Sequence, residues 1–471
     1  MIKKLVSHTL IYALGPQLPR IASFFVLPII TKDLTAVDYG VYGVVIAYTG
    51  LLGGIKDLGI AVNLSNLFYK YPTRWQTSWR QLHGYLSLWS FPYALMQSVL
   101  LYFIIPHEAQ INMWIIILLS AISSLFFDTT IMFGGRYYQF VQRHLYMAMT
   151  SAIVGTLSIA LNLITISYFK MGYMGWFIST FLGTFVSFLF YFFPLYFKYK
   201  LAPIFKVRMK FIRHQLKVAL PMVPHSYASY LLNTSDRLVM NVLGIRISQI
   251  GIYNIAYTFG NYFDFVGGAI GMAVGPIYTQ LYSLKREGDV RSITFALQAC
   301  FLIGSFLVCL WLKELFGLLI KNPDLQSGYY LAIIVVMGYN YRPLYWAVVN
   351  KLAYYEQTQV MWRISFIAGV INIILNFIFI PIYGFQVAAI TSFVGLLYIG
   401  FSGFFLKTYR QMENADYFPT VWIVAIIATL VLVYILKDAS LYIKVVVSIA
   451  TTALGLIVFV RFKKVLSNIN V

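Results

Sequence analysis

Apolar runs of about twenty residues recur from one end of the chain to the other, and we count fourteen of them. Each run is long enough to cross a hydrocarbon core of about 30 Å as a helix. With 60% hydrophobic and only 11% charged residues, the 471-residue chain falls in the membrane class and outside the soluble one. We therefore predict an all-α polytopic membrane protein with about 14 transmembrane helices, the first of them retained.

The basic residues are divided unequally between the two sets of loops that such a topology creates. Of the 35 lysines and arginines, 23 fall in the loops on the side of the termini and seven on the other side. Because the richer side of a membrane protein faces the cytoplasm, both termini are predicted to be cytoplasmic. The net charge of +20 then reflects topology and contact with anionic lipid, and we expect no nucleic-acid partner.

The chain also repeats itself in one direction. AIVGTLSIALN at 152–162 matches FIAGVINIILN at 366–376, and GYMGWFISTFLG at 172–183 matches GFQVAAITSFVG at 384–395. Six predicted helices separate equivalent positions, so both copies share one orientation in the membrane. The prediction is two six-helix lobes in a parallel pseudo-repeat, followed by two further helices. The predicted parts are an N-lobe (1–200), a basic cytoplasmic linker (201–215), a C-lobe (216–408) and a C-terminal helix pair with tail (409–471).

Two pairs of prolines open the first helix of each predicted lobe, in PQLPR at 16–20 and PMVPH at 221–225. Proline lacks the backbone donor and kinks or breaks a helix. Interrupted segments at corresponding positions of two halves point to the binding site of a transporter, although packing kinks are the alternative. We therefore predict hinges or kinks at Pro16, Pro19, Pro221 and Pro224.

Five basic residues lie within predicted helices, where a charge is costly unless it meets water or a partner. Lys56, followed by Asp57, is interpreted as an interfacial residue or a surface pair. The others are candidate substrate-binding residues of a cationic cavity, with structural ion pairs as the alternative, and His225 joins them as a titratable group. This predicted cavity consists of Arg20, His225, Arg237, Arg342 and Arg363.

Intramembrane acids are fewer, and two are candidates for ion coupling. Asp236 precedes Arg237 in LNTSDRLVMNVLG, so their side chains diverge around the helix. Asp264 lies in NYFDFVGGAIGMAVGP, where Gly267, Gly271 and Gly275 also favour simple close packing. The excess of bases suits an anionic substrate, and arginine forks fit phosphate oxygens with two parallel hydrogen bonds.

The sequence contains no Walker A motif, no H-E-x-x-H, no nucleophile elbow and no cluster with metal-ligand spacing. The loops on the outer side are mostly shorter than about 15 residues, too short for a catalytic domain there. We therefore predict a transporter, not an enzyme, without cofactor or bound metal.

Three segments of the sequence, and the order in which they occur, resemble those of one known family. They are KDLTAVDYGVYGVV with the following KDLGI, LPMVPHSYASYLLNTSDRLVMNVLGIRISQIGIYNIAY, and INIILNFIFIPIYGFQVAAITSF. Together they resemble the polysaccharide-transporter branch of the MOP (multidrug/oligosaccharidyl-lipid/polysaccharide) flippase superfamily, which includes the Wzx-type flippases of O-antigen and capsule repeat units. The resemblance covers essentially the whole chain.

The resemblance implies a function and a location. It implies export of an undecaprenyl-diphosphate-linked oligosaccharide across a bacterial cytoplasmic (inner) membrane, by alternating access about a central cationic cavity. It further implies a proton or sodium gradient as the driving force and polysaccharide polymerase machinery as a partner. Arg20, Asp236 and Arg237 stand where such proteins keep polar residues. A lipid II flippase and a drug or metabolite cation antiporter of the same superfamily remain the alternatives.

Overall fold

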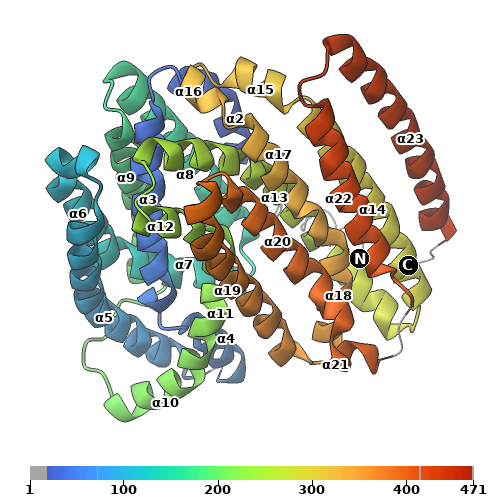
Figure 1. Cartoon of the computed structure of the whole chain (residues 1–471). Helices are drawn as coiled ribbons and strands as arrows, with labels where there is room; N and C mark the ends of the chain where they lie inside the picture. Colours follow the sequence, from blue (N-terminus) through green and yellow to red (C-terminus); the bar gives the residue numbers. More distant parts are fainter. Residues whose placement is uncertain (1–17, 72, 413–414, 469–471) are drawn as a thin grey trace. The chain divides into compact units, whose positions relative to one another are not determined.

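The computed structural model describes residues 18–71, 73–412 and 415–468, and every regular element in these ranges is a helix (Figure 1). The chain divides into two compact units. Unit 1 holds residues 1–230 and 246–251, and unit 2 holds 231–245 and 252–471. The boundary passes through α11 (Val223–Asn233) and near the start of α13 (Ile247–Ser283).

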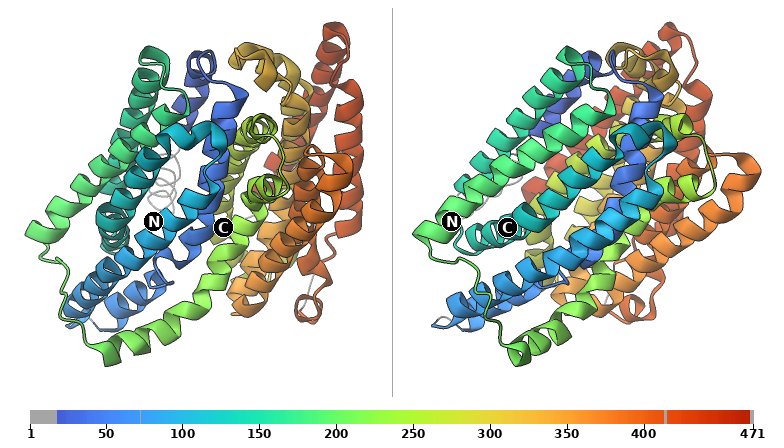
Figure 2. Two further views of the ribbon diagram at one scale, coloured as in Figure 1. Left: turned by 60° about the vertical axis from the view of Figure 1, so that its left-hand side comes forward. Right: turned by 90° about the vertical axis from the view of Figure 1, so that its left-hand side faces the viewer.

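Unit 1 contains long helices that run beside one another (Figure 2). Its elements before α11 are α2 (Leu18–Ile30), α3 (Ala36–Lys56), α4 (Ala61–Lys70), α5 (Trp75–Ile104), η2 (His107–Asn112), α6 (Met113–Ile122), η3 (Ser123–Phe127), α7 (Asp128–Phe140), α8 (His144–Asn162), η4 (Leu163–Tyr168), α9 (Tyr173–Phe193), η5 (Pro194–Lys198), α10 (Met209–Ala219) and η6 (Leu220–Met222).

Unit 2 ends with two helices of 18 and 28 residues. Its elements besides α11 and α13 are α12 (Ser235–Val242), α14 (Glu287–Leu310), α15 (Leu312–Leu319), α16 (Pro323–Gln326), α17 (Tyr329–Gly338), η7 (Tyr339–Tyr341), α18 (Arg342–Tyr354), α19 (Thr358–Tyr383), α20 (Val387–Phe401), η8 (Ser402–Phe405), α21 (Lys407–Arg410), α22 (Pro419–Leu436) and α23 (Leu441–Asn468).

Within the described ranges, nine helical segments are long and apolar enough to cross a membrane. Large apolar side chains on them stay exposed, among them Phe103, Trp114 and Ile435, as expected for helices that face lipid. The prediction of an all-α polytopic membrane protein is therefore confirmed, while the number 14 stays a prediction. The nine segments are 36–70, 75–104, 107–140, 145–168, 173–198, 287–310, 360–383, 387–405 and 419–436.

The KDLTAVD segment, residues 32–38, leads into the first turn of α3. Thr35 and Asp38 make a capping box, in which the Thr35 amide donates to Asp38 Oδ2 (2.7 Å) and the Asp38 amide donates to Thr35 Oγ1 (3.2 Å). Asp38 Oδ1 also accepts the Tyr173 amide at the first turn of α9 (2.8 Å). One carboxylate thus satisfies amides at the ends of two helices, which fixes α3 beside α9.

The sequence repeat is visible in the packing of each unit. A Cβ atom on Gly155 in α8 would meet the Pro19 ring of α2 at 2.3 Å, and one on Gly369 in α19 would meet Leu231 Cβ of α11 at 2.5 Å. Close packing on the unit's first helix therefore requires glycine in both copies. Pro19 and Leu231 are 212 residues apart, whereas Pro19 and Pro224 are 205 apart. By this packing, the two proline pairs lie seven residues, about two helical turns, out of register.

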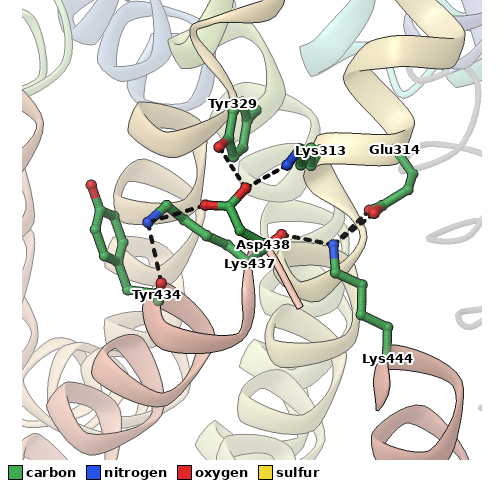
Figure 3. A network of polar contacts seen from close by, with 7 residues as sticks. All are labelled: Lys313, Glu314, Tyr329, Tyr434, Lys437, Asp438 and Lys444. Carbon is green, nitrogen blue, oxygen red and sulfur yellow. Dashed lines mark hydrogen bonds and ion pairs between the residues drawn. The ribbon is translucent and has the colours of Figure 1, made fainter. Parts of the chain in front are cut away.

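The last two helices, α22 and α23, pack on α14 and α17 of unit 2, and a polar network holds the turn between them (Figures 1 and 3). The Lys444 ammonium is fully buried and donates to both carboxylate oxygens of Glu314 (2.7 and 3.0 Å) and to the Lys437 carbonyl (2.7 Å). Beside it, Asp438 Oδ1 accepts Lys313 Nζ at 2.5 Å. Three donated bonds satisfy the buried ammonium, so this turn is anchored to α15.

Candidate functional site

The TSDR segment lies where one helix ends and the next begins. Thr234, with φ −134° and ψ −24°, separates α11 from the eight-residue α12, so Asp236 lies in the first turn of α12. The unpaired amides of that turn favour a negative charge there. The adjacent Arg237 points to different partners, as the i, i+1 spacing predicts.

The Asp236 carboxylate is completely buried, and four side chains donate to it. Oδ1 accepts the amides of Asn372 (2.9 Å) and Asn376 (2.8 Å), both on α19. Oδ2 accepts the hydroxyls of Tyr253 on α13 (2.5 Å) and Ser392 on α20 (2.7 Å). A buried carboxylate is tolerated when its lone pairs are used in this way. The network thus joins α12, α13, α19 and α20 through a single side chain.

A second layer of oxygen atoms surrounds the first. Thr391 Oγ1 donates to Asn376 Oδ1 (2.5 Å), and Asn376 Nδ2 also donates to Asn372 Oδ1 (3.0 Å). The carboxylate, amide and hydroxyl oxygens of this cluster are hard ligands, the type that binds alkali and alkaline-earth cations. The carboxylate can also bind a proton. We call the residues Asp236, Asn372, Asn376, Thr391 and Ser392 the carboxylate cluster.

Unit 1 has polar residues at the corresponding repeat positions but no acid. Ser158, Asn162, Ser179 and Thr180 occupy the repeat positions of Asn372, Asn376, Thr391 and Ser392, respectively. The helix that corresponds to the TSDR segment, α2, reads LPRIASFFVLPII and contains no acid. Among the described residues, the carboxylate cluster is therefore a feature of unit 2 alone.

Arg237 is only 6% exposed, and the groups that its guanidinium contacts directly are neutral. Its Nε donates to Asn254 Oδ1 (3.0 Å), and its Nη1 donates to the Asn233 carbonyl (2.8 Å). The guanidinium stacks on the Tyr257 ring, with Cζ 4.3 Å from the ring centroid. In the described part of the chain no carboxylate forms an ion pair with Arg237, so its positive charge is not neutralised by a direct partner.

Arg342 lies at a second helix interruption. The 3-10 turn η7 separates α17 from α18, and Pro343 follows at the second position of α18. Gln298 Nε2 donates to the Asn340 carbonyl (2.9 Å), and Asn340 Nδ2 donates to Ser305 Oγ (2.8 Å). These bonds satisfy polar groups at the break and hold the start of α18 against α14.

The Arg342 Nη2 atom forms an ion pair with Asp264 Oδ1, so two residues predicted for different roles meet in one site. A Cβ atom on Gly267 would lie 2.6 Å from Arg342 Cδ, which explains why the small residue is needed one turn after Asp264. Arg342 Nε is buried and has no hydrogen-bond partner within the described residues. The guanidinium therefore has a donor available for an additional acceptor.

The remaining predicted site residues lie apart from these two centres or outside the described side chains. Arg363 on α19 is exposed, with Cζ 6.0 Å from the Trp362 ring centroid. Arg20 belongs to α2 and His225 to α11, but their side chains lie outside the described set, as does Pro16. Pro19 and Pro224 lie in first turns of α2 and α11, and Pro221 lies in η6.

Sequence reasoning missed the polar residues of α19 and α20 that complete the carboxylate cluster. Asn372 and Asn376 are four residues apart and therefore share one helix face. That spacing, inside an otherwise apolar helix, was a usable signal, because amides in a membrane span need partners. Thr391 and Ser392 gave no comparable sequence signal, since single hydroxyls bond to their own helix in many membrane spans.

Comparison with solved structures identifies the fold. The chain is similar to "Lipid II flippase MurJ, inward closed conformation", with TM-score 0.72 and 14% identity over 97% of this chain and 98% of that one. It is also similar to the crystal structure of a single-residue mutant of a MATE protein, with TM-score 0.52 and 15% identity over 93% and 97%. No curated protein sequence matches the chain significantly.

The chain therefore has the fold of these two solved structures, and nine of its described helical segments are long and apolar enough to cross a membrane. The model of one sequence family, described as "Polysaccharide biosynthesis protein", matches residues 5–282, more than half of the chain. The protein belongs to this family, which confirms the family expected from the sequence blocks.

Proposed function

We propose that the protein moves an undecaprenyl-diphosphate-linked oligosaccharide from the cytoplasmic to the outer leaflet of a bacterial cytoplasmic membrane by alternating access. Both termini would be cytoplasmic, and polymerase machinery on the outer side would use the product. The observation that supports this proposal most is the Arg342–Asp264 ion pair at an interrupted helix, where Arg342 Nε is buried and has no hydrogen-bond partner among the described residues. Family membership supports a polysaccharide intermediate as the cargo.

The diphosphate would bind by replacing Asp264 as the ion-pair partner of Arg342. A guanidinium presents five donors in a planar fork, and phosphate oxygens can occupy two of them at once. Cargo phosphate that takes the place of Asp264 would also reach the unpartnered Nε. Arg237, which has no carboxylate partner in the described part of the chain, adds positive charge within the same unit.

The released Asp264 and the buried Asp236 are the two acids that a coupling cation could use. The carboxylate cluster offers one charge and several neutral oxygens, a set that suits Na⁺, and its Asn side chains can turn either oxygen or nitrogen toward the carboxylate. A proton on Asp236 Oδ2 would require only that the Tyr253 or Ser392 hydroxyl turn from donor to acceptor. We propose that this cluster takes the cation and that the Arg342–Asp264 pair takes the anion.

The test is a flipping assay in proteoliposomes with an undecaprenyl-diphosphate-linked oligosaccharide. Loss of a charge-assisted contact predicts that Arg342→Ala lowers the rate by about tenfold or more, with partial recovery in Arg342→Lys. The matched control is Arg286→Ala, which breaks the half-exposed Arg286–Asp289 pair of the same unit. If Arg342→Ala and Arg286→Ala flip the lipid at the wild-type rate, the anion site is elsewhere.

A lipid II flippase is the second candidate, since a protein of that name shares this fold. Its cargo also carries a lipid diphosphate, so the same vesicles loaded with lipid II decide between the two. A drug or metabolite cation antiporter would require the acids, not the arginines, to contact the cargo. Export of a cationic drug that persists in Arg342→Ala would establish that third function instead.

A further inference from the structure

Unit 1 contains a cavity of about 350 Å³ between α3, α5, α6, η3, α7 and α9. This volume lies at the lower end of the range of about 300–1,000 Å³ that small-molecule sites occupy. The π-helical segment η3 interrupts α6 and α7 in the cavity wall and brings Asp128 to its rim. Such π segments occur frequently at functional sites.

The charges of this cavity are balanced. Lys56 Nζ forms an ion pair with Asp128 Oδ2, and no other charged side chain among the described residues lines the cavity. The ion-pair partner of Lys56 is therefore not the adjacent Asp57 but a residue 72 positions further along the chain, while the interfacial position of Lys56 stays a prediction. Asp57 instead accepts the Gly59 amide at the end of α3 (3.0 Å). An anion would have to displace Asp128 from Lys56, whereas an uncharged ring could enter the cavity without breaking this ion pair.

The other polar groups of the cavity are hydroxyls and one amide. Thr49 donates to the Val45 carbonyl (2.9 Å) and Ser123 to the Leu119 carbonyl (2.9 Å). Since these protons are used within their own helices, the oxygen lone pairs remain to accept hydrogen bonds from a ligand. Gln97 Oε1 accepts the Ser124 hydroxyl (2.7 Å), which fixes the amide at the cavity wall.

Aromatic and hydroxyl-bearing side chains both line the same cavity. Tyr93, Phe177 and Phe181 line the cavity together with Thr180 and Thr184. Ring faces pack on the apolar C–H faces of a sugar, while hydroxyl lone pairs bond to its O–H groups. A charge-neutral wall with both features suits a hydroxylated, uncharged ring better than it suits a phosphate or a bare cation.

We propose that this cavity is a glycan subsite, which binds an uncharged sugar residue of the cargo. The proposal rests on the proposed function and adds to it the class of group bound in unit 1. It predicts that the cavity contributes to the transport of glycan-bearing lipid and contributes nothing to the transport of the same lipid diphosphate without sugar.

Two glycines provide a matched test. A Cβ atom on Gly53 would meet nothing within 4 Å, and Gly53 lines the cavity, so Gly53→Leu would fill it. Gly135 on α7 of the same unit has equally open surroundings and does not line the cavity. Both substitutions raise helix propensity to the same extent, so their comparison isolates the cavity. Thr184→Val removes one cavity hydroxyl without filling the space, and Thr429→Val on α22 is its control.

Flipping of undecaprenyl diphosphate bearing an uncharged tetrasaccharide is compared with flipping of undecaprenyl diphosphate alone. We expect Gly53→Leu to slow the glycan-bearing lipid by about tenfold or more, and Thr184→Val by a few-fold, with the bare lipid diphosphate unchanged. Gly135→Leu and Thr429→Val should behave as wild type with both lipids. If Gly53→Leu and Gly135→Leu transport the glycan-bearing lipid equally well, the cavity binds no part of the cargo.

A direct binding measurement separates this proposal from the proposed function. If wild-type protein flips neither lipid, the flippase proposal fails, and calorimetry with the soluble uncharged tetrasaccharide decides the subsite. Binding to wild type and Gly135→Leu that is lost in Gly53→Leu would support it, and the absence of binding to all three would overturn it. Tighter binding of an acidic tetrasaccharide than of the uncharged one would show that Lys56 leaves Asp128 for a carboxylate, which also contradicts the proposal.

Discussion

Replacement of Asp236 by leucine should be the most damaging single change to the carboxylate cluster. The four donors from Tyr253, Ser392, Asn372 and Asn376 would lose their acceptor inside the protein. Some can turn to secondary partners, since the two hydroxyls lie 3.3 Å apart and the two asparagines already bond at 3.0 Å. If two donors remain unpaired at about 1–3 kcal/mol each, the cost is about 2–6 kcal/mol.

The assay is thermal denaturation of the purified protein in detergent. The quantity measured at each temperature is the fraction of the protein that remains monodisperse. Asp236→Asn keeps the shape and one acceptor oxygen, so we expect a smaller loss of about 1–2 kcal/mol. Asp289→Leu breaks only the half-exposed pair with Arg286, which should cost no more than about 1 kcal/mol. The expected order of stability is wild type, Asp289→Leu, Asp236→Asn and Asp236→Leu. If Asp236→Leu denatures at the same temperature as Asp289→Leu, the network does not stabilise unit 2 and the reasoning fails.

Two further predictions concern adjacent glycines and an exposed ion pair. Gly267→Ala should displace the Arg342 side chain, whose Cδ would lie 2.6 Å from the new methyl group, and slow flipping, whereas Gly268→Ala meets nothing within 4 Å and should leave transport unchanged. The Lys313 hydrogen bond lowers the pKa of Asp438 below its ordinary value of 3.8, so the pair stabilises the protein at neutral pH and this contribution is lost as the pH falls below about 4. Melting curves of wild type and Lys313→Met should therefore converge on acidification, and a constant difference between them would contradict this assignment.

Hydropathy alone was sufficient to predict the all-helical membrane fold, because a lipid-exposed backbone must satisfy its polar groups internally. The helix breaks were harder to predict. Pro343 indicated the break at Arg342, but nothing in the local sequence separates Thr234 from a continuous helix. The partners of charged groups could not be predicted at all, because the Lys56–Asp128 and Arg342–Asp264 pairs join residues 72 and 78 positions apart.

Two buried lysine ammonium groups also have partners that the sequence does not predict. Lys351 and Lys444 have the sequence context of loop residues, and positive-inside reasoning counted them as such. In the structure both are almost completely buried, and each pairs with a glutamate, Glu287 and Glu314 respectively. A lysine near a helix end can either extend to the interface or pair inside, and only the tertiary structure decides which.

The absence of an acid in α2, the unit 1 counterpart of the segment that carries Asp236, has an electrical consequence. With a single such carboxylate among the described residues of the two repeats, the proposed cycle would import one cation for each lipid exported. Outward movement of an anion and inward movement of a cation both carry positive current into the cell. The membrane potential would then drive both half-reactions in the same sense, by about 2.3 kcal/mol per elementary charge for each 100 mV. On this account the voltage across the membrane, and not the ion gradient alone, would set the direction of flipping.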